Sequence, residues 1–233
     1  AALFSSVVGV GGAETITLEA SQTAMDLGAG VDKVIITQTL LTANSNTSAT
    51  IDAGDGTDTL QVTAATTAIQ DADFRGLTNF EVLSVTSGTN AIVMDAIATT
   101  AGLVTVQTGA GVDTITPDHG TETILVDKNG ADEIIMHAAY DSSATTLTIN
   151  TGTATDDFHL DFTAFQGGTA ANFGAAATAK TLVSESDTWY FASGVLTVFN
   201  EALSPAAAED IIIIGSTIVD GANGHLSADV SGA

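Results

Sequence analysis

The sequence predicts an all-β fold, and the architecture we expect is a parallel β-solenoid of the β-helix or β-roll kind, with a β-sandwich as the alternative. Three observations support this prediction. Short runs rich in Ile, Val, Leu and Thr recur along the chain, Gly/Asp loops of similar sequence separate them, and helical periodicity is scarce. The small and β-branched residues that dominate the chain favour strands and tight turns.

The bulk composition narrows the class of protein. The chain has 233 residues, 45% of them hydrophobic, which is enough for one large all-β domain or two small ones. Its formal net charge is −24, from 28 acidic and 4 basic residues. Such a charge disfavours nucleic acid and anionic membranes and favours cations, above all divalent ones. The absence of cysteine excludes disulfides and thiolate metal sites.

The Gly/Asp loops form a family of related segments. Each reads apolar, Asp/Asn/Gln, any residue, Gly, any residue, Gly, any residue, Asp, any residue, apolar, and the last two each lack one glycine. The segments are 25–34, 51–60, 106–115, 126–135 and 149–158, with a weaker echo at 85–93. In the echo, Asn90 stands where the other loops have aspartate.

The spacing of these loops indicates a repeat. The aspartates that close them are Asp32, Asp58, Asp113, Asp132 and Asp156, which follow one another at steps of 26, 55, 19 and 24 residues. The echo at Asn90 divides the long step, so the period is about 19–32 residues per unit. This period is typical of architectures in which each unit forms one turn of a coil.

The runs between the loops are the predicted strands. They cover residues 32–37, 58–64, 80–86, 102–108, 122–127, 133–138 and 145–150. Two segments, 67–77 and 204–210, are expected to form a helical turn or two. In the second, Ser204 followed by Pro205 has the pattern of an N-cap and a first helical residue.

The loop sequences exclude three common kinds of site. A phosphate-binding loop needs a lysine after its last glycine and a helix behind it, and this chain has neither a Gly-Lys-Ser/Thr sequence nor a helical pattern after the loops. The three-glycine dinucleotide fingerprint is also missing. Residues 52–63 do not fit an EF-hand, because Gly54 and Gly56 occupy positions 3 and 5, where that loop needs acidic ligands.

A calcium turn of another kind does fit. Glycines permit positive φ, so consecutive carbonyl oxygens can turn toward one point, and an aspartate follows two residues later. Calcium takes 6–8 oxygen ligands, which two loops stacked about 4.8 Å apart can supply together. Stacking also brings one aspartate above another, and such close like charges need a cation between them. Calcium binding would then contribute directly to folding.

These arguments predict calcium as the cofactor and assign its ligands to the loops. The predicted metal-site residues are Asp26, Gly28, Gly30, Asp32, Asp52, Gly54, Asp55, Gly56, Asp58, Gly109, Gly111, Asp113, Asp132 and Asp156.

The three best loops resemble the calcium-binding nonapeptide of the RTX (repeats-in-toxin) family, Gly-Gly-x-Gly-x-Asp-x-apolar-x. The matching residues are Gly28, Gly30, Asp32 and Val34; Gly54, Gly56, Asp58 and Leu60; and Gly109, Gly111, Asp113 and Ile115. The leading glycine of the family pattern is replaced by Leu27, Ala53 or Thr108, and the units are not in tandem. The resemblance therefore implies isolated calcium turns at the corners of the coil in place of a regular β-roll.

Two further segments resemble secreted bacterial proteins. Residues 73–92 are similar to the F-x-x-L-x-N-x-E-x-L segments of surface-layer proteins and large adhesins of Gram-negative bacteria. Residues 187–217 are similar to the C-terminal region of RTX proteins exported by type I systems. The resemblance implies a β-solenoid with calcium turns over 1–186 and a C-terminal β cap over 187–233, with one continuous domain as the alternative. It also implies an exported protein that folds only outside the calcium-poor cytoplasm.

Other candidate residues are interpreted structurally, and no catalytic residue is predicted. Strand alternation places Asp157, His159 and Asp161 on one face, which we interpret as the wet face of a half-buried strand. The aromatic run 189–191 is assigned to packing in preference to a sugar-binding platform. The remaining histidines show no metal-binding spacing; they are His119, His137 and His225.

The predicted function is that of a secreted, calcium-binding structural protein that self-assembles into a surface layer, lattice or filament. The expected partner is the chain itself, with a cell-surface polysaccharide as a second candidate and neither nucleic acid nor membrane insertion. The uncharged segment 3–10 is either the first strand or an edge that pairs with a neighbouring subunit. The alternatives are an adhesin module of an RTX protein and a noncatalytic β-roll appendage of a secreted enzyme.

Overall fold

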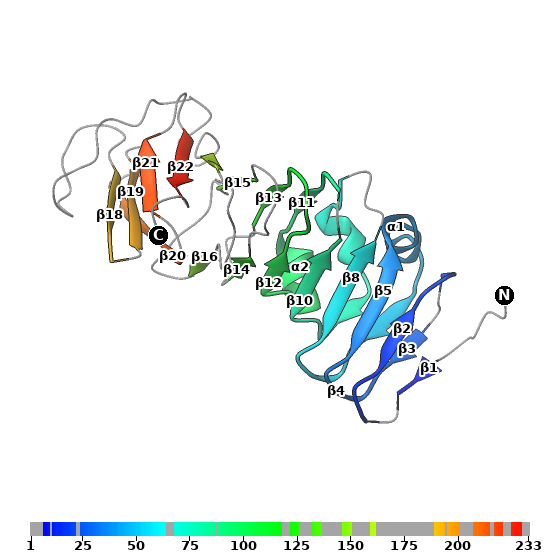
Figure 1. The fold of residues 1–233 in the computed structure, drawn as a ribbon. Coiled ribbons are helices and arrows are strands. Elements are labelled where there is room, and N and C mark those ends of the chain that lie inside the picture. The colour runs from blue at the N-terminus through cyan, green and yellow to red at the C-terminus, as the bar shows by residue number, and fades with distance from the viewer. Residues whose placement is uncertain are drawn as a thin grey trace.

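The fold is shown as a ribbon in Figure 1, and it is an elongated stack of short strands. The computed structural model describes residues 7–9, 11–21, 24–63, 68–86, 88–117, 122–125, 132–136, 146–150, 159–161, 189–193, 195–200, 207–214, 217–220 and 225–229. Within these residues the chain is mostly strand, arranged in sheets whose pairing is parallel except among the last strands, β17 to β22. The sequence predicts this all-β, largely parallel arrangement.

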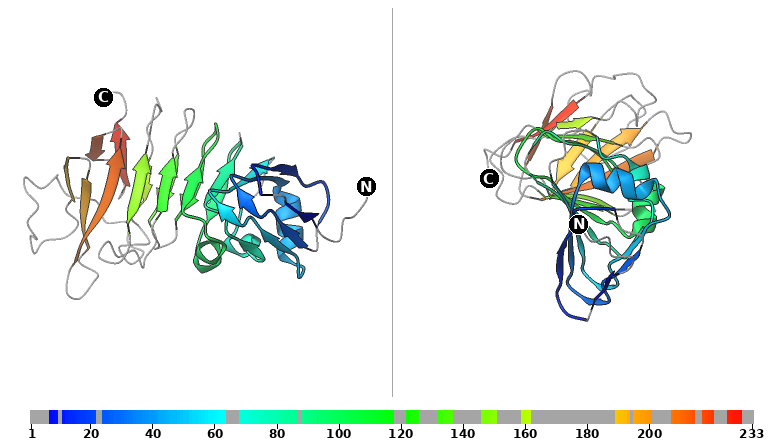
Figure 2. Two further views of the ribbon diagram at one scale, coloured as in Figure 1. Left: turned by 90° about the horizontal axis from the view of Figure 1, so that it is seen from below. Right: turned by 90° about the vertical axis from the view of Figure 1, so that its right-hand side faces the viewer.

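The largest sheet has ten strands and runs the length of the molecule (Figures 1 and 2). In spatial order its strands are β2 (Thr15–Thr17), β5 (Lys33–Thr37), β8 (Thr59–Thr63), β10 (Val82–Val85), β12 (Thr105–Gln107), β14 (Glu122–Leu125), β16 (Leu147–Asn150), β20 (Ala207–Ile214), β19 (Val195–Asn200) and β18 (Trp189–Ala192). Pairing is parallel from β2 to β20, whereas β19 is antiparallel to both β20 and β18.

Three smaller sheets accompany it. A four-stranded parallel sheet contains β1 (Val7–Val8), β3 (Ala24–Asp26), β6 (Thr50–Asp52) and β9 (Leu77–Thr78). A two-stranded sheet joins β4 (Ala29–Gly30) to β7 (Asp55–Gly56). A six-stranded sheet contains β11 (Ala91–Val93), β13 (Thr114–Thr116), β15 (Glu133–Ile135), β17 (His159–Asp161), β22 (His225–Asp229) and β21 (Thr217–Asp220). None of the described sheets closes on itself.

From β1 to β17 the chain alternates between the ten-stranded sheet and a smaller sheet, and the smaller sheet changes once, after β9. From β1 to β8 it passes from the four-stranded sheet through a turn to the ten-stranded sheet. From β10 to β17 it passes from the ten-stranded sheet through a turn to the six-stranded sheet. The last five strands do not alternate, since β18–β20 lie in the ten-stranded sheet and β21 and β22 in the six-stranded sheet. Figure 2 shows the resulting strands lying side by side along the long axis.

The register aligns equivalent apolar residues into columns. Along the ten-stranded sheet one column is formed by Val34, Leu60, Leu83, Val106, Ile124 and Ile149. All of these side chains are fully or almost fully buried, and the residues between them along each strand are only half-buried. Because strand side chains alternate with period two, a slip of one residue would expose the whole column.

Short helices cover a further side of the first layers (Figure 1). They are α1 (Gln38–Ser45), the single-turn 3₁₀ helix η1 (Asp71–Phe74) and α2 (Ala96–Ala101), and η1 contacts both α-helices. Asp71 accepts hydrogen bonds from the backbone N–H groups of Asp95 and Ala98, which satisfies the first turn of α2. No helix in the described part of the chain is long and apolar enough to cross a membrane.

Most local predictions are confirmed. Each of the seven predicted runs contains a strand, segment 67–77 contains η1, and β1 lies within segment 3–10. The prediction of a helical turn over 204–210 is wrong, because Ala207–Asp210 belong to β20. The isoleucines at 212–214 pair with β16, and the alanines earlier in the segment join the same strand by pairing with β19. The helices α1 and α2 were not predicted.

Glycines allow the turns to stack in contact. A Cβ atom built on Gly30 would lie 1.9 Å from the carbonyl oxygen of Gly12, and one built on Gly56 would lie 1.8 Å from the carbonyl oxygen of Gly30. Gly12 is different, because its nearest neighbour would be a side-chain oxygen of Glu14 at 3.4 Å. We call the stacked glycines Gly12, Gly30 and Gly56 the glycine column. Backbone contact excludes a side chain at Gly30 and Gly56, and only Gly12, at the N-terminal end of the glycine column, has room for one.

This contact predicts that a Gly→Ala substitution destabilises the protein at one place in the glycine column and has little effect at another. We expect Gly56→Ala to lower the free energy of unfolding by about 1–3 kcal/mol, since the backbone of the neighbouring turn must move to admit a methyl group. The matched control Gly12→Ala should change it by less than about 0.5 kcal/mol. Urea unfolding followed by circular dichroism measures both, and equal destabilisation by the two variants would contradict the explanation.

Candidate functional site

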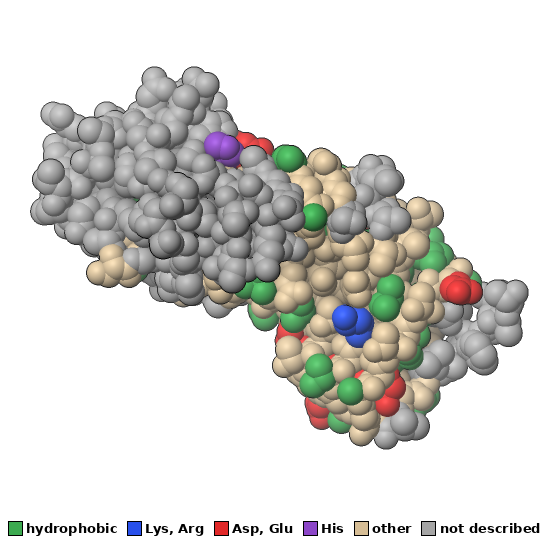
Figure 3. Space-filling view, viewed as in Figure 1, with side chains coloured by type: hydrophobic (Ala, Val, Ile, Leu, Met, Phe, Trp, Pro, Cys, Tyr) green, Lys and Arg blue, Asp and Glu red, His purple; other side chains and the backbone are tan. Residues whose placement is uncertain are grey.

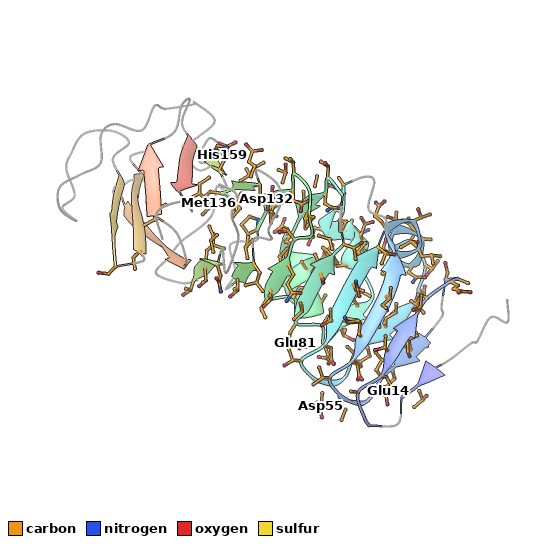
Figure 4. All side chains as sticks on the ribbon, viewed as in Figure 1. Glu14, Asp55, Glu81, Asp132, Met136 and His159 are labelled. Atoms are coloured by element: carbon orange, nitrogen blue, oxygen red, sulfur yellow. The ribbon has the colours of Figure 1, made fainter. Side chains whose placement is uncertain are left out.

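The candidate site consists of two rows of polar residues, each placed directly before the first residue of a strand. The first row is Glu14, Asp32, Asp58 and Glu81, which precede β2, β5, β8 and β10 of the ten-stranded sheet. The second row is Asn90, Asp113 and Asp132, which precede β11, β13 and β15 of the six-stranded sheet. We refer to the successive segments that contain equivalent residues as layers. Figure 4 shows Glu14 and Glu81 at one edge of the molecule and Asp132 at another.

Carboxylates of the first row connect neighbouring layers through the backbone. Oδ1 of Asp32 accepts a hydrogen bond from the N–H of Glu14 at 2.6 Å, and Oδ1 of Asp58 accepts one from the N–H of Asp32 at 2.6 Å. Oε2 of Glu81 accepts the N–H of Asp58 at 2.7 Å. Each carboxylate therefore takes the amide of the equivalent residue one layer closer to the N-terminus, in charge-assisted bonds worth about 1.5–3 kcal/mol each.

The second row repeats this arrangement. Oδ1 of Asp113 accepts the backbone N–H of Asn90 at 2.8 Å and its side-chain Nδ2–H at 2.7 Å. Oδ1 of Asp132 accepts the N–H of Asp113 at 2.8 Å. Asn90 thus occupies the position of an aspartate in its layer, as the sequence echo predicts.

The two aspartates of the first row are buried and incompletely hydrogen-bonded. Asp32 is 1% exposed and Asp58 is 0% exposed. Oδ2 of each, together with Oε2 of Glu14, is buried without a hydrogen-bond partner. Leaving such an atom unsatisfied costs about 1–3 kcal/mol, and more when the group is charged. The row therefore offers strong acceptor oxygens and no donor, an arrangement that a cation or a proton would satisfy.

The electrostatics of Asp58 follow from this placement. Burial raises the pKa of Asp58 above its ordinary value, the nearby carboxylates of Glu81 and Asp32 raise it further, and the hydrogen bond from the Asp32 N–H opposes the rise. Figure 3 shows acidic side chains at the lower edge of the described part of the molecule, where Figure 1 places the turn that contains β4.

The oxygen atoms of the first row can hold a hard cation only if backbone carbonyl groups also act as ligands. Among the described residues, no group of three or more Asp, Glu or His side chains is arranged to hold a metal ion. Calcium accepts backbone carbonyl oxygens as ligands. In the stacked turns the carbonyl oxygen of Gly30 lies against Gly56, and that of Gly28 lies against Gly54 and accepts the N–H of Asp55. The buried Oδ2 atoms of Asp32 and Asp58 are the oxygens that calcium would satisfy.

The other predicted acids in the first two loops have different positions. Oδ1 of Asp26 accepts the N–H of Gly28 at 3.1 Å, and Oδ1 of Asp52 accepts the N–H of Gly54 at 3.0 Å. Each of these two side chains therefore stabilises the turn that follows it. In those turns Gly28 and Gly54 have φ of +88° and +89°. Asp55 is exposed between the two glycines of its loop.

The third strong loop lies apart from the first two. Gly109, Gly111 and Asp113 lead into β13 of the six-stranded sheet, whereas the loops that end at Asp32 and Asp58 lead into the ten-stranded sheet. The structure therefore brings Asp32 together with Asp58, and Asp113 together with Asp132, but it does not unite all four. Asp156 lies outside the described residues.

Sequence reasoning missed two members of the first row. Glu14 and Glu81 belong to the row although each is a glutamate, and Glu81 follows no Gly-x-Gly pair. The available signal is spacing, since Glu14 lies 18 residues before Asp32 and Glu81 lies 23 residues after Asp58.

The alternation predicted for Asp157, His159 and Asp161 is confirmed where the strand is described. His159 and Asp161 are half-buried on β17, and Leu160 between them is fully buried. Asp157, His119 and His137 lie outside the described residues, as do the side-chain surroundings of His225 and of the aromatic run in β18.

Comparison with known proteins supplies no relative. No family model, curated protein or solved structure matches the chain.

The geometry predicts how Asp58→Asn behaves in the absence of metal. An asparagine keeps the acceptor for the Asp32 N–H and removes a buried charge beside Asp32 and Glu81. Asn90 is buried at the equivalent place of the second row, so a side-chain amide fits at this kind of position. We expect the variant in chelator at pH 7 to be at least as stable as the parent protein in urea unfolding.

The pH dependence has a defined sign. Because the pKa of Asp58 is higher in the folded state, folding takes up a proton between the unfolded and folded pKa values. Stability contributed by this carboxyl is present below that window and is lost as pH rises through the folded pKa. Asp58→Asn should flatten this loss, and the exposed Asp55→Asn should not. A variant that is markedly less stable than the parent protein in chelator would refute this account.

Proposed function

We propose that the chain is a secreted structural protein, wound as a parallel β-solenoid with calcium at its Gly/Asp turns, that self-assembles at the cell surface or outside the cell. The observation that carries the proposal is the first acidic row. There, Asp32 and Asp58 are stacked in adjacent layers, and each has one carboxylate oxygen buried without a hydrogen-bond partner.

The parallel pairing supports a solenoid over a sandwich. Consecutive strands alternate between sheets, equivalent residues align in columns, and pairing is parallel through most of the length. In β-sandwiches the strands are joined by antiparallel connections, so this pattern is not expected there. A coil of layers also explains why the spacing of paired residues stays between 18 and 26 along the first row.

Calcium-gated folding is the mechanism that we propose. Without a cation, folding must bury carboxylates that repel one another in a chain of net charge −24. Calcium at the turns would compensate these charges, so that the free energy of binding becomes free energy of folding. A chain built in this way stays unfolded where calcium is scarce and folds after export.

A calcium titration tests the proposal. At calcium concentrations of about 100 times the dissociation constant, each site should add about 2.7 kcal/mol to the free energy of unfolding. We expect Asp32→Asn and Asp58→Asn to lose most of this gain, and Asp55→Asn, an exposed acid in the same loop as Asp58, to keep it. Thermal melts in calcium, magnesium and chelator give the comparison, and a melting temperature that is the same in calcium and chelator would refute the calcium site.

A further inference from the structure

At one end of the stack, two of the described strands each pair on one side only. Among the strands that the structure describes, β1 pairs only with β3, and β2 pairs only with β5. Figures 1 and 2 show these strands at one end of the long axis and β18, β19, β21 and β22 at the opposite end. The strand β18 is the outermost strand of the ten-stranded sheet at that opposite end.

The outer edge of β2 presents hydrogen-bonding groups. The carbonyl of Glu14 accepts the N–H of Lys33, and the N–H of Leu18 donates to the carbonyl of Ile35, so both of these residues face β5. Successive residues of a paired strand direct their backbone groups to opposite sides. The N–H and C=O groups of Thr15 and Thr17 therefore point to the open edge.

The first acidic row begins at the same end of the stack. Asp32, Asp58 and Glu81 each accept an amide from the layer on their N-terminal side, which gives the row a direction. Glu14 begins the row, and its Oε2 atom is buried without a hydrogen-bond partner. One more layer placed on this end would continue the row at Glu14.

The two edge strands of the ten-stranded sheet lack the charged residues that commonly protect such edges. The edge strands β2 and β18 contain no charged residue, and neither does β1, in a chain of net charge −24. Val8 of β1 is 71% exposed. Proteins that avoid edge-to-edge pairing usually place charged residues or proline on such strands, or cover them.

We propose that the occupant of this end is a second copy of the chain, docked head to tail, with its β18 pairing in parallel with β2. Since β19 is antiparallel to both β18 and β20, β18 runs in the same direction as β2. A copy translated along the stack therefore continues the ten-stranded sheet with a parallel pair. Because this contact joins two different surfaces, its repetition produces an open filament. The inference rests on the self-assembly included in the proposed function.

The test uses sedimentation velocity and electron microscopy in calcium. The parent protein should form a series of oligomers that grow with concentration into filaments. Val8→Asp adds a negative charge to the exposed end, and Thr17→Pro removes an outward N–H without breaking a bond to β5. Each variant should weaken association at least tenfold. The matched control Val31→Asp changes a valine that is 65% exposed at a turn of the second layer, and it should assemble as the parent protein does.

Each outcome decides the question once melting curves in calcium show that the variants are folded. The proposal is supported if association weakens in Val8→Asp and Thr17→Pro but not in the control Val31→Asp. Filament formation by both variants overturns this interface and leaves the proposed self-assembly standing. An equal loss in Val31→Asp, or a dimer that never grows, overturns the head-to-tail contact. A parent protein that stays monomeric in calcium overturns both the inference and the self-assembly of the proposed function.

Discussion

The structure depends on backbone contact between stacked turns. Gly30 and Gly56 allow each turn to lie directly on the carbonyl of the turn before it, and this approach brings the Asp32 amide within reach of the carboxylate of Asp58. Once the turns are stacked, the strands that follow them start in register, and apolar residues such as Val34 and Leu60 align without further adjustment. Local glycine chemistry therefore sets the long-range order of the sheet.

The same carboxylates have two opposing effects. One oxygen of Asp32 or Asp58 fixes the adjacent layer through a strong hydrogen bond, and the other oxygen is buried with nothing to compensate it. The geometry that defines the register thus also creates the electrostatic cost of folding. Stability should consequently respond to pH and to cations more steeply than the size of the apolar core alone would suggest.

Strands and glycine turns could be predicted because their signals are local. Alternation over four or five residues defines a strand, and Gly-x-Gly-x-Asp defines a tight turn wherever it occurs. The motif does not state which sheet follows, so the loop ending at Asp113 could not be separated from those ending at Asp32 and Asp58. Glu81 was missed because stacking tolerates a longer acid in the same place. The helix α1 was missed because, apart from the cap at Thr37, its sequence offers little helical pattern.

The parallel pairing has a mechanical consequence. Hydrogen bonds between neighbouring strands, and those of the acidic row, all lie along the long axis of the stack. A force that pulls the two ends apart therefore loads successive layers in series, and the layers peel away one at a time at low force. A force applied across the strands must instead shear many bonds together. Such a molecule resists sideways load far better than tension along its axis.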